Sequence, residues 1–227
     1  MLKSPIVASL ILVLCASLLA QNSDLETRRK ALDSLLKEQW EYTLKNDPIF
    51  ASIIGDKRYN DKLGDESLEA VKKDYQQERE FLKRFEAIDT TGFPEQEVLN
   101  KELMVLNLKN DIEGEKFEGY LMPVNQMSGI HLQAPQVVSL LSFQTVKDYD
   151  DYITRMKGLS KIFDQVTERM KLGTQKGLMP PQFLLEKVTQ QTRGIVRKNR
   201  KNLHLRNPSA NSLKLFLMQI KQGYEQN

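Results

Sequence analysis

The chain has 227 residues, and 33 basic against 30 acidic side chains give it a formal net charge of only +3. This charge is too small to indicate a nucleic-acid partner, and we expect none. Cys15 is the only cysteine, so no disulfide can form within the chain, and stability must come from the packed core of one ordinary domain.

Residues 1–20 have the pattern of a secretory signal peptide: a basic start at Lys3, an apolar run over residues 6–19, and a small residue, Ala20, before polar sequence. The run of about 14 residues is shorter than the roughly 20 that span a bilayer. We therefore expect an exported protein, periplasmic or extracellular, with no membrane span after cleavage. An uncleaved anchor and lipid attachment at Cys15 are the alternatives.

The sequence that follows the signal peptide predicts two helices, up to Gly55. A capping-box pattern at Ser23 and Glu26 indicates the start of the first helix. Asp47 followed by Pro48 predicts a short second helix, which Gly55 closes. The first helix is expected to bury one apolar stripe at spacings of seven and four residues, made by Leu25, Leu32, Leu36, Trp40 and Leu44.

Two longer helices are expected to follow. Residues 56–64 are charged and rich in turn formers, which predicts a surface loop before a helix that starts at Asp65 or Ser67. Residues 91–94 predict a turn, and the helix after it is expected to stop near Gly114. Short links between long helices favour antiparallel packing.

The second half of the chain contains the clearest helical pattern. Residues 145–148 predict an N-terminal cap, and residues 173–177 are expected to end the helix that follows. Pro180 and Pro181 then predict the start of another helix. Because no segment alternates with the two-residue period of a strand, the predicted fold class is all-α, an antiparallel, bundle-like arrangement of helices.

Residues 122–135 interrupt the helical pattern with polar side chains between two prolines. We expect them to lie outside any helix, as an ordered connection or as the wall of a cleft. In a cleft, Asn125, Gln126 and His131 are the candidate contacts to a peptide backbone, since their amides and imidazole can donate and accept hydrogen bonds. Alternatively, they hold the loop against neighbouring helices.

The sequence contains no recognisable catalytic or metal-binding motif. Neither His131 nor His204 lies in a His-Glu-x-x-His helix, and the chain has no Gly-x-Ser-x-Gly elbow and no Gly-rich phosphate loop. We therefore expect no catalytic residue, no metal site and no cofactor within this chain. A hydrolase that uses His131 alone is a minor third hypothesis.

The chain ends in a basic stretch. Residues 187–224 contain nine Lys or Arg side chains and no acidic one. Anionic lipid headgroups are one expected partner, and a tail outside the fold is the plainer interpretation. We therefore divide the chain into a signal peptide (1–20), a helical domain (21–194) and a divergent basic tail (195–227).

Several motifs together resemble the bacterial domain-of-unknown-function 885 family. The most specific is the run from Pro123 to Gly129, and the resemblance covers residues 24–194. The other matching pieces are Asp47-Pro48, Gly55, Leu63, Asp65-Glu66-Ser67, Pro135-Gln136, the segment 145–149, Gly177 and Pro180-Pro181.

This resemblance implies an exported helical protein related to gluzincin-type zinc metallopeptidases. Zinc is expected only in longer relatives that carry His-Glu-x-x-His, which has no matching position here. Two hypotheses follow: an inactive N-terminal part of a peptidase-like protein that contacts peptide substrate, or a stand-alone periplasmic binding module. The loss of acidic residues after Gly194 suggests that the chain is truncated and its end replaced, for example by a change of reading frame.

Overall fold

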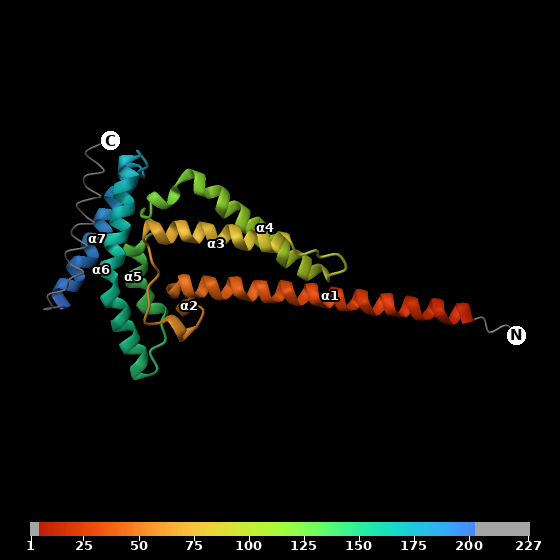
Figure 1. Cartoon of the computed structure of the whole chain (residues 1–227). Coiled ribbons are helices and arrows are strands. Elements are labelled where there is room, and N and C mark those ends of the chain that lie inside the picture. The colour runs from red at the N-terminus through yellow and green to blue at the C-terminus, as the bar shows by residue number, and fades with distance from the viewer. Residues whose placement is uncertain (1–4, 203–227) are drawn as a thin grey trace. The chain divides into compact units, whose positions relative to one another are not determined.

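The computed structural model describes the backbone of residues 5–202 and the side chains of residues 23–194. Seven α-helices are found in this part of the chain and no strand, which confirms the all-α class. The helices are α1 (Pro5–Asn46), α2 (Pro48–Ile53), α3 (Leu68–Glu86), α4 (Glu95–Gly114), α5 (Ile130–Leu140), α6 (Val146–Gln175) and α7 (Gln182–Asn202) (Figure 1).

Three short 3-10 helices supplement them, η1 (Lys57–Tyr59), η2 (Glu115–Phe117) and η3 (Gly119–Leu121). The chain forms two compact units, one from residues up to 40 with residues 77–113, and the other from residues 41–76 with residues 114 onward. Helices α1, α3 and α4 each contribute residues to both units.

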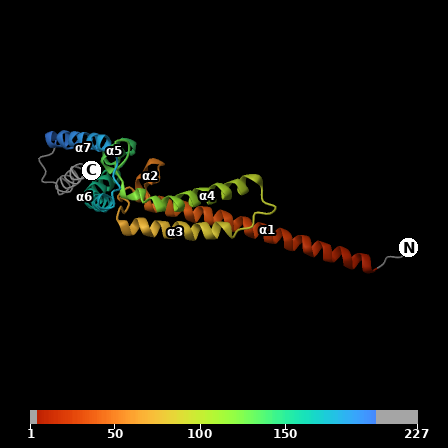
Figure 2. The same ribbon diagram turned by 90° about the horizontal axis from the view of Figure 1, so that it is seen from above.

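The first unit contains parts of α1, α3 and α4, and α4 runs back beside α3 after the expected turn (Figures 1 and 2). Charged side chains tie its segments together: the Arg29 guanidinium donates to the Glu97 carboxylate at 2.9 Å, and Lys101 donates to the Ile88 carbonyl at 2.6 Å. Its core consists of buried apolar side chains, namely Leu32, Leu35, Phe81, Phe85, Phe93 and Leu108.

Two expectations for α1 are wrong. Ser23 does not start the helix but lies inside it, and its carbonyl accepts a hydrogen bond from the Thr27 hydroxyl. Residues 6–22 contain no glycine or proline, so no strong helix breaker precedes Ser23. Trp40, expected in the buried stripe, is 44% exposed, and Leu35 is buried instead. Four residues of an α-helix turn through about 400°, about 40° more than one full turn. Residues spaced by four therefore move progressively away from the buried face.

The second unit packs α5, α6 and α7 around one apolar cluster (Figures 1 and 2). The predicted cap of α6 is confirmed: the Thr145 hydroxyl accepts from the Asp148 N–H, and the Asp148 carboxylate accepts from the Thr145 N–H at 2.8 Å. The cluster is made by Val124, Ile130, Ala134, Ile162, Phe163, Val166, Met170, Leu185 and Val188.

Lys57 of η1 strengthens this cap by donating to Asp148 at 2.9 Å. This hydrogen bond, together with those from the Thr145 and Gln144 N–H groups, holds the pKa of the Asp148 carboxyl well below its usual value.

The predicted starts of α2 at Asp47 and of α3 at Ser67 are confirmed too, since both side chains accept a hydrogen bond from the first helical turn.

The expectation that residues 122–135 lie entirely outside helices is wrong. Gly129 ends the irregular stretch, and α5 begins at Ile130 with Pro135 inside it. Proline at this position removes the hydrogen bond to the carbonyl four residues earlier, that of His131, and its ring crowds that carbonyl, yet the helix continues to Leu140. Pro135 is exposed, so its ring does not disturb the buried face of this short helix.

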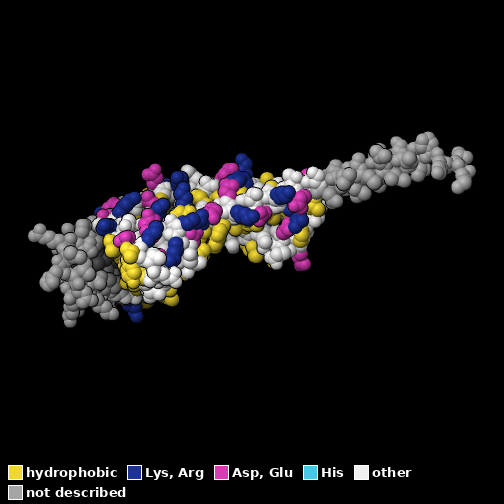
Figure 3. Space-filling model, turned by 90° about the horizontal axis from the view of Figure 1, so that it is seen from below, with side chains coloured by type: hydrophobic (Ala, Val, Ile, Leu, Met, Phe, Trp, Pro, Cys, Tyr) yellow, Lys and Arg dark blue, Asp and Glu magenta, His cyan; other side chains and the backbone are white. Residues whose placement is uncertain are grey.

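On the face shown in Figure 3, basic and acidic side chains are interspersed. Within the described residues, none of the helices combines the length and the hydropathy of a membrane span. The side chains of the expected signal peptide and of the basic tail lie outside the described residues. Both assignments therefore stay predictions.

Candidate functional site

The loop between η3 and α5 is held by its own asparagine. The Asn125 side-chain oxygen accepts the N–H groups of Met127 at 2.8 Å and of Ser128 at 2.9 Å, and its backbone N–H donates to the Ser128 carbonyl at 2.9 Å. This is the local turn that a short polar side chain forms with the backbone that follows it. Asn125 therefore shapes the loop that contains two of the three candidate residues.

His131 and Gln126 are linked through Gln191 of α7. His131 Nε2 lies 3.2 Å from Gln191 Oε1, and Gln191 Nε2 donates to the Gln126 carbonyl at 3.0 Å. The His131 side chain is only 1% exposed. The Gln126 side-chain oxygen is buried and accepts no hydrogen bond within the described residues. A role of these residues in peptide binding stays a prediction.

Burial lowers the pKa of His131 below its usual value, because the charged imidazolium is poorly solvated there, although the contact with Gln191 opposes this. As pH falls below about 6.5, the unfolded chain takes up the proton before the folded one does, and stability falls.

We therefore expect the free energy of unfolding to decrease between pH 7 and 5 with a slope of up to about 1.4 kcal/mol per pH unit from this residue. The test compares the His204→Gln variant with the His204→Gln, His131→Gln double variant. Urea unfolding of each is monitored by circular dichroism at several pH values between 5 and 7. The slopes of the two proteins should differ over this range. Equal slopes would show that His131 titrates alike in the folded and unfolded chains.

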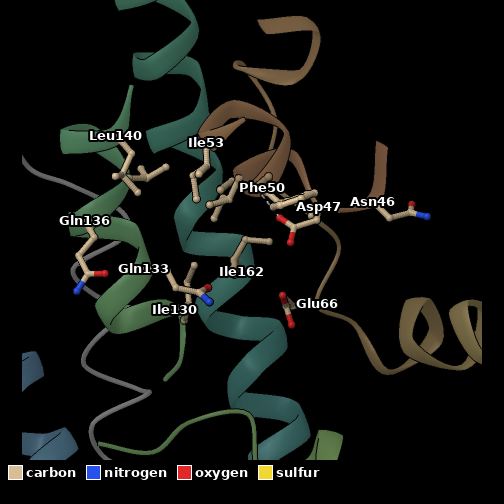
Figure 4. A pocket seen from close by; sticks show the side chains of 14 residues that line it. Asn46, Asp47, Phe50, Ile53, Glu66, Ile130, Gln133, Gln136, Leu140 and Ile162 are labelled. Atoms are coloured by element: carbon tan, nitrogen blue, oxygen red, sulfur yellow. Dashed lines mark hydrogen bonds between the residues drawn. The ribbon is translucent and has the colours of Figure 1, made fainter. Parts of the chain in front are cut away.

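A cavity of about 400 Å³ lies elsewhere in the second unit, between α2, the segment before α3, α5 and α6. Figure 4 shows Ile53 of α2 directed toward Leu140 of α5, and Gln133 projecting from α5 toward Ile162 of α6. The lining residues are Asn46, Asp47, Ile49, Phe50, Ile53, Leu63, Gly64, Glu66, Ile130, Gln133, Gln136, Val137, Leu140 and Ile162.

Most of the cavity lining is apolar, and its polar groups are amides and two carboxylates. Asp47 Oδ1 accepts the Phe50 N–H at 2.9 Å, which fixes this side chain at the start of α2. Glu66 forms an ion pair with Arg169, a nearly buried residue of α6. The cavity can therefore take an apolar group and offer hydrogen bonds to polar groups beside it.

Sequence reasoning missed this cavity. Its α5 side is formed by Gln133, Gln136, Val137 and Leu140, which share one helix face at spacings of three and four residues. This mixed face is visible in the sequence once α5 is known to continue through Pro135. None of Asn125, Gln126 and His131 lines the cavity. Among the described side chains, no group of three His, Cys, Asp or Glu residues could hold a metal ion.

Comparison with known proteins identifies a family for this chain. No curated protein matches the chain. Residues 48–225 match one family model, more than half of the chain. The matched range continues past Gly194, where we expected the resemblance to end, and through the basic stretch. The chain belongs to the family described as bacterial protein of unknown function (DUF885).

Proposed function

We propose that this chain is a non-catalytic helical part of an exported protein related to zinc metallopeptidases, and that it binds peptide without cleaving it. Membership in the family supports the proposal through the relationship that the sequence resemblance implies. The chain has no position that matches the His-Glu-x-x-His motif of the longer relatives. The role of this part is then to hold substrate.

The observation that carries the proposal is the cavity bordered by α2 and α5. Its volume of about 400 Å³ lies within the range of roughly 300–1,000 Å³ that is usual for ligand sites. The apolar lining suits the side chain of an extended peptide. Gln133 and Asn46 carry amide groups that can donate to and accept from a peptide backbone.

A stand-alone binding module would use the same cavity. The two hypotheses differ in whether the rest of the chain must pack against further polypeptide. In the first unit, α4 exposes three leucines on one face, Leu99, Leu103 and Leu106, at 43–53%. Exposed leucines on one face of a helix favour a chain that packs against further polypeptide. The purified chain should then bind the dye ANS and self-associate, whereas a complete module should stay monodisperse.

The test measures binding of a fluorescein-labelled peptide to the purified chain by fluorescence anisotropy. The probe is a short peptide with leucine and lysine at its centre and glycine and alanine elsewhere. Leu140→Glu places a carboxylate on the apolar lining and is expected to weaken binding at least tenfold. Val138→Glu is the matched control, because Val138 is also exposed on α5 but does not line the cavity.

Equal binding by these two variants would contradict the assignment of the cavity. The second readout is cleavage of the same peptide after addition of equimolar zinc, and no turnover is expected from the purified chain. Tight zinc uptake together with cleavage of the peptide would overturn the non-catalytic role. The assignment of the cavity as the binding site would still depend on the comparison of Leu140→Glu with Val138→Glu.

A further inference from the structure

We propose that the cavity selects peptides in which an apolar side chain is next to a positive charge, from lysine, arginine or a free amino terminus. This inference rests on the proposed function and adds the chemical class of the ligand. The two ends of the cavity differ, because one is apolar and the other carries negative charge.

One end of the cavity is apolar. Ile53 and Leu140 approach each other there from α2 and α5 (Figure 4). Both are about half exposed, although large aliphatic side chains gain free energy when they leave water. An apolar ligand side chain placed between them would cover both, so this end is suited to a leucine, isoleucine or phenylalanine side chain.

The other end carries negative charge. Within the described part of the chain, the ionisable residues of the lining are Asp47 and Glu66, and both are carboxylates (Figure 4). Among the side chains that the structure describes, no lysine, arginine or histidine lines the cavity. A positive group on the ligand would therefore meet attraction here, and an acidic ligand would be repelled.

The two carboxylates are not equally available. Glu66 is already paired with Arg169, so much of its charge is compensated within the protein. Asp47 is exposed and makes no ion pair within the described residues. The buried Arg155 acts on it electrostatically, but Asp61 and Asp151 share the same guanidinium and act on it more strongly. Asp47 is therefore the carboxylate that would meet the ligand's positive group.

The test uses three labelled peptides that differ at one position: lysine, methionine in its place, and glutamate in its place. Methionine is similar in length to lysine and has no charge. We expect the lysine peptide to bind about fivefold more tightly than the methionine peptide, which corresponds to a partly exposed ion pair of about 1 kcal/mol. The preference should weaken as salt is added.

Asp47→Asn should abolish this preference, because asparagine keeps the cap of α2 but not the charge. Asp164→Asn is the control, since Asp164 is an exposed residue of α6 outside the cavity lining and its replacement changes the net charge equally. The inference is overturned if the lysine and methionine peptides bind alike, or if the preference survives in Asp47→Asn. Equal binding of all three peptides leaves the proposed function standing, whereas no binding of any of them refutes both.

Discussion

Gly129→Ala is expected to destabilise the second unit by roughly 3–5 kcal/mol, a large part of the stability of an ordinary domain. The backbone of Gly129 has φ +128° and ψ 162°, a combination that residues other than glycine rarely adopt. A Cβ atom there would lie 2.7 Å from Cγ1 of Val124 and 3.0 Å from Nδ1 of His131. Both neighbours are buried, so neither can move away at low cost.

Gly177→Ala separates the cost of backbone strain from the cost of the steric clash. Gly177 also has positive φ, +72°, but a Cβ atom there would meet nothing within 4 Å. Its replacement should cost only the backbone strain, about 1–2 kcal/mol. The measurement is the urea dependence of the circular dichroism of the purified chain. Similar losses in the two variants would mean that the loop before α5 can relax around the new methyl group.

Much of the helical layout could be predicted from the sequence because its signals are local. The caps at Asp47 and Thr145 lie within three residues of the N–H groups that they bind, and the apolar spacing of α6 needs no knowledge of its neighbours. Trp40 shows where this reasoning fails. Periodicity places a residue on a face, but only the packing of other helices decides which part of that face is covered.

The site depends on contacts between distant segments, which periodicity does not reveal. His131 meets Gln191 across 60 residues, and the cavity joins α2 to α5 and α6. The sequence correctly marked residues 122–129 as an irregular segment. It could not show that the Asn125 side chain binds the backbone of its own loop, that Gln191 of α7 donates to the Gln126 carbonyl, or that a face suited to ligand binding lies on the helix that follows.

Arg155→Met is expected to destabilise the second unit by about 3 kcal/mol, within the range for removing one partner from a buried polar network. Arg155 is 1% exposed. Its Nη2 lies 2.7 Å from the Ser52 hydroxyl, 2.8 Å from the Tyr59 carbonyl and 3.2 Å from the Pro48 carbonyl. Methionine fills a similar volume but donates no hydrogen bond, so the Tyr59 carbonyl would lose its donor.

Charge adds to this loss. Burial lowers the pKa of Arg155, but Asp61, Asp151 and Asp47 oppose that shift and favour the charged form. Without the guanidinium these carboxylates lose a common countercharge. Arg84→Met is the matched control, because Arg84 pairs with Glu38 through two hydrogen bonds of 2.6 Å at an exposed site. That pair should contribute less than about 1 kcal/mol.

The same arginine links stability to the proposed binding site. It connects α6 to α2 and to η1, and the cavity is lined by Phe50 and Ile53 of α2 and by Asp47, which caps that helix. We therefore expect Arg155→Met to weaken peptide binding severalfold at temperatures where circular dichroism shows that the chain is still folded. Arg84→Met should bind the peptide as the unmodified chain does. A folded Arg155→Met variant with unchanged affinity would mean that Arg155 stabilises the unit without positioning α2 for the ligand.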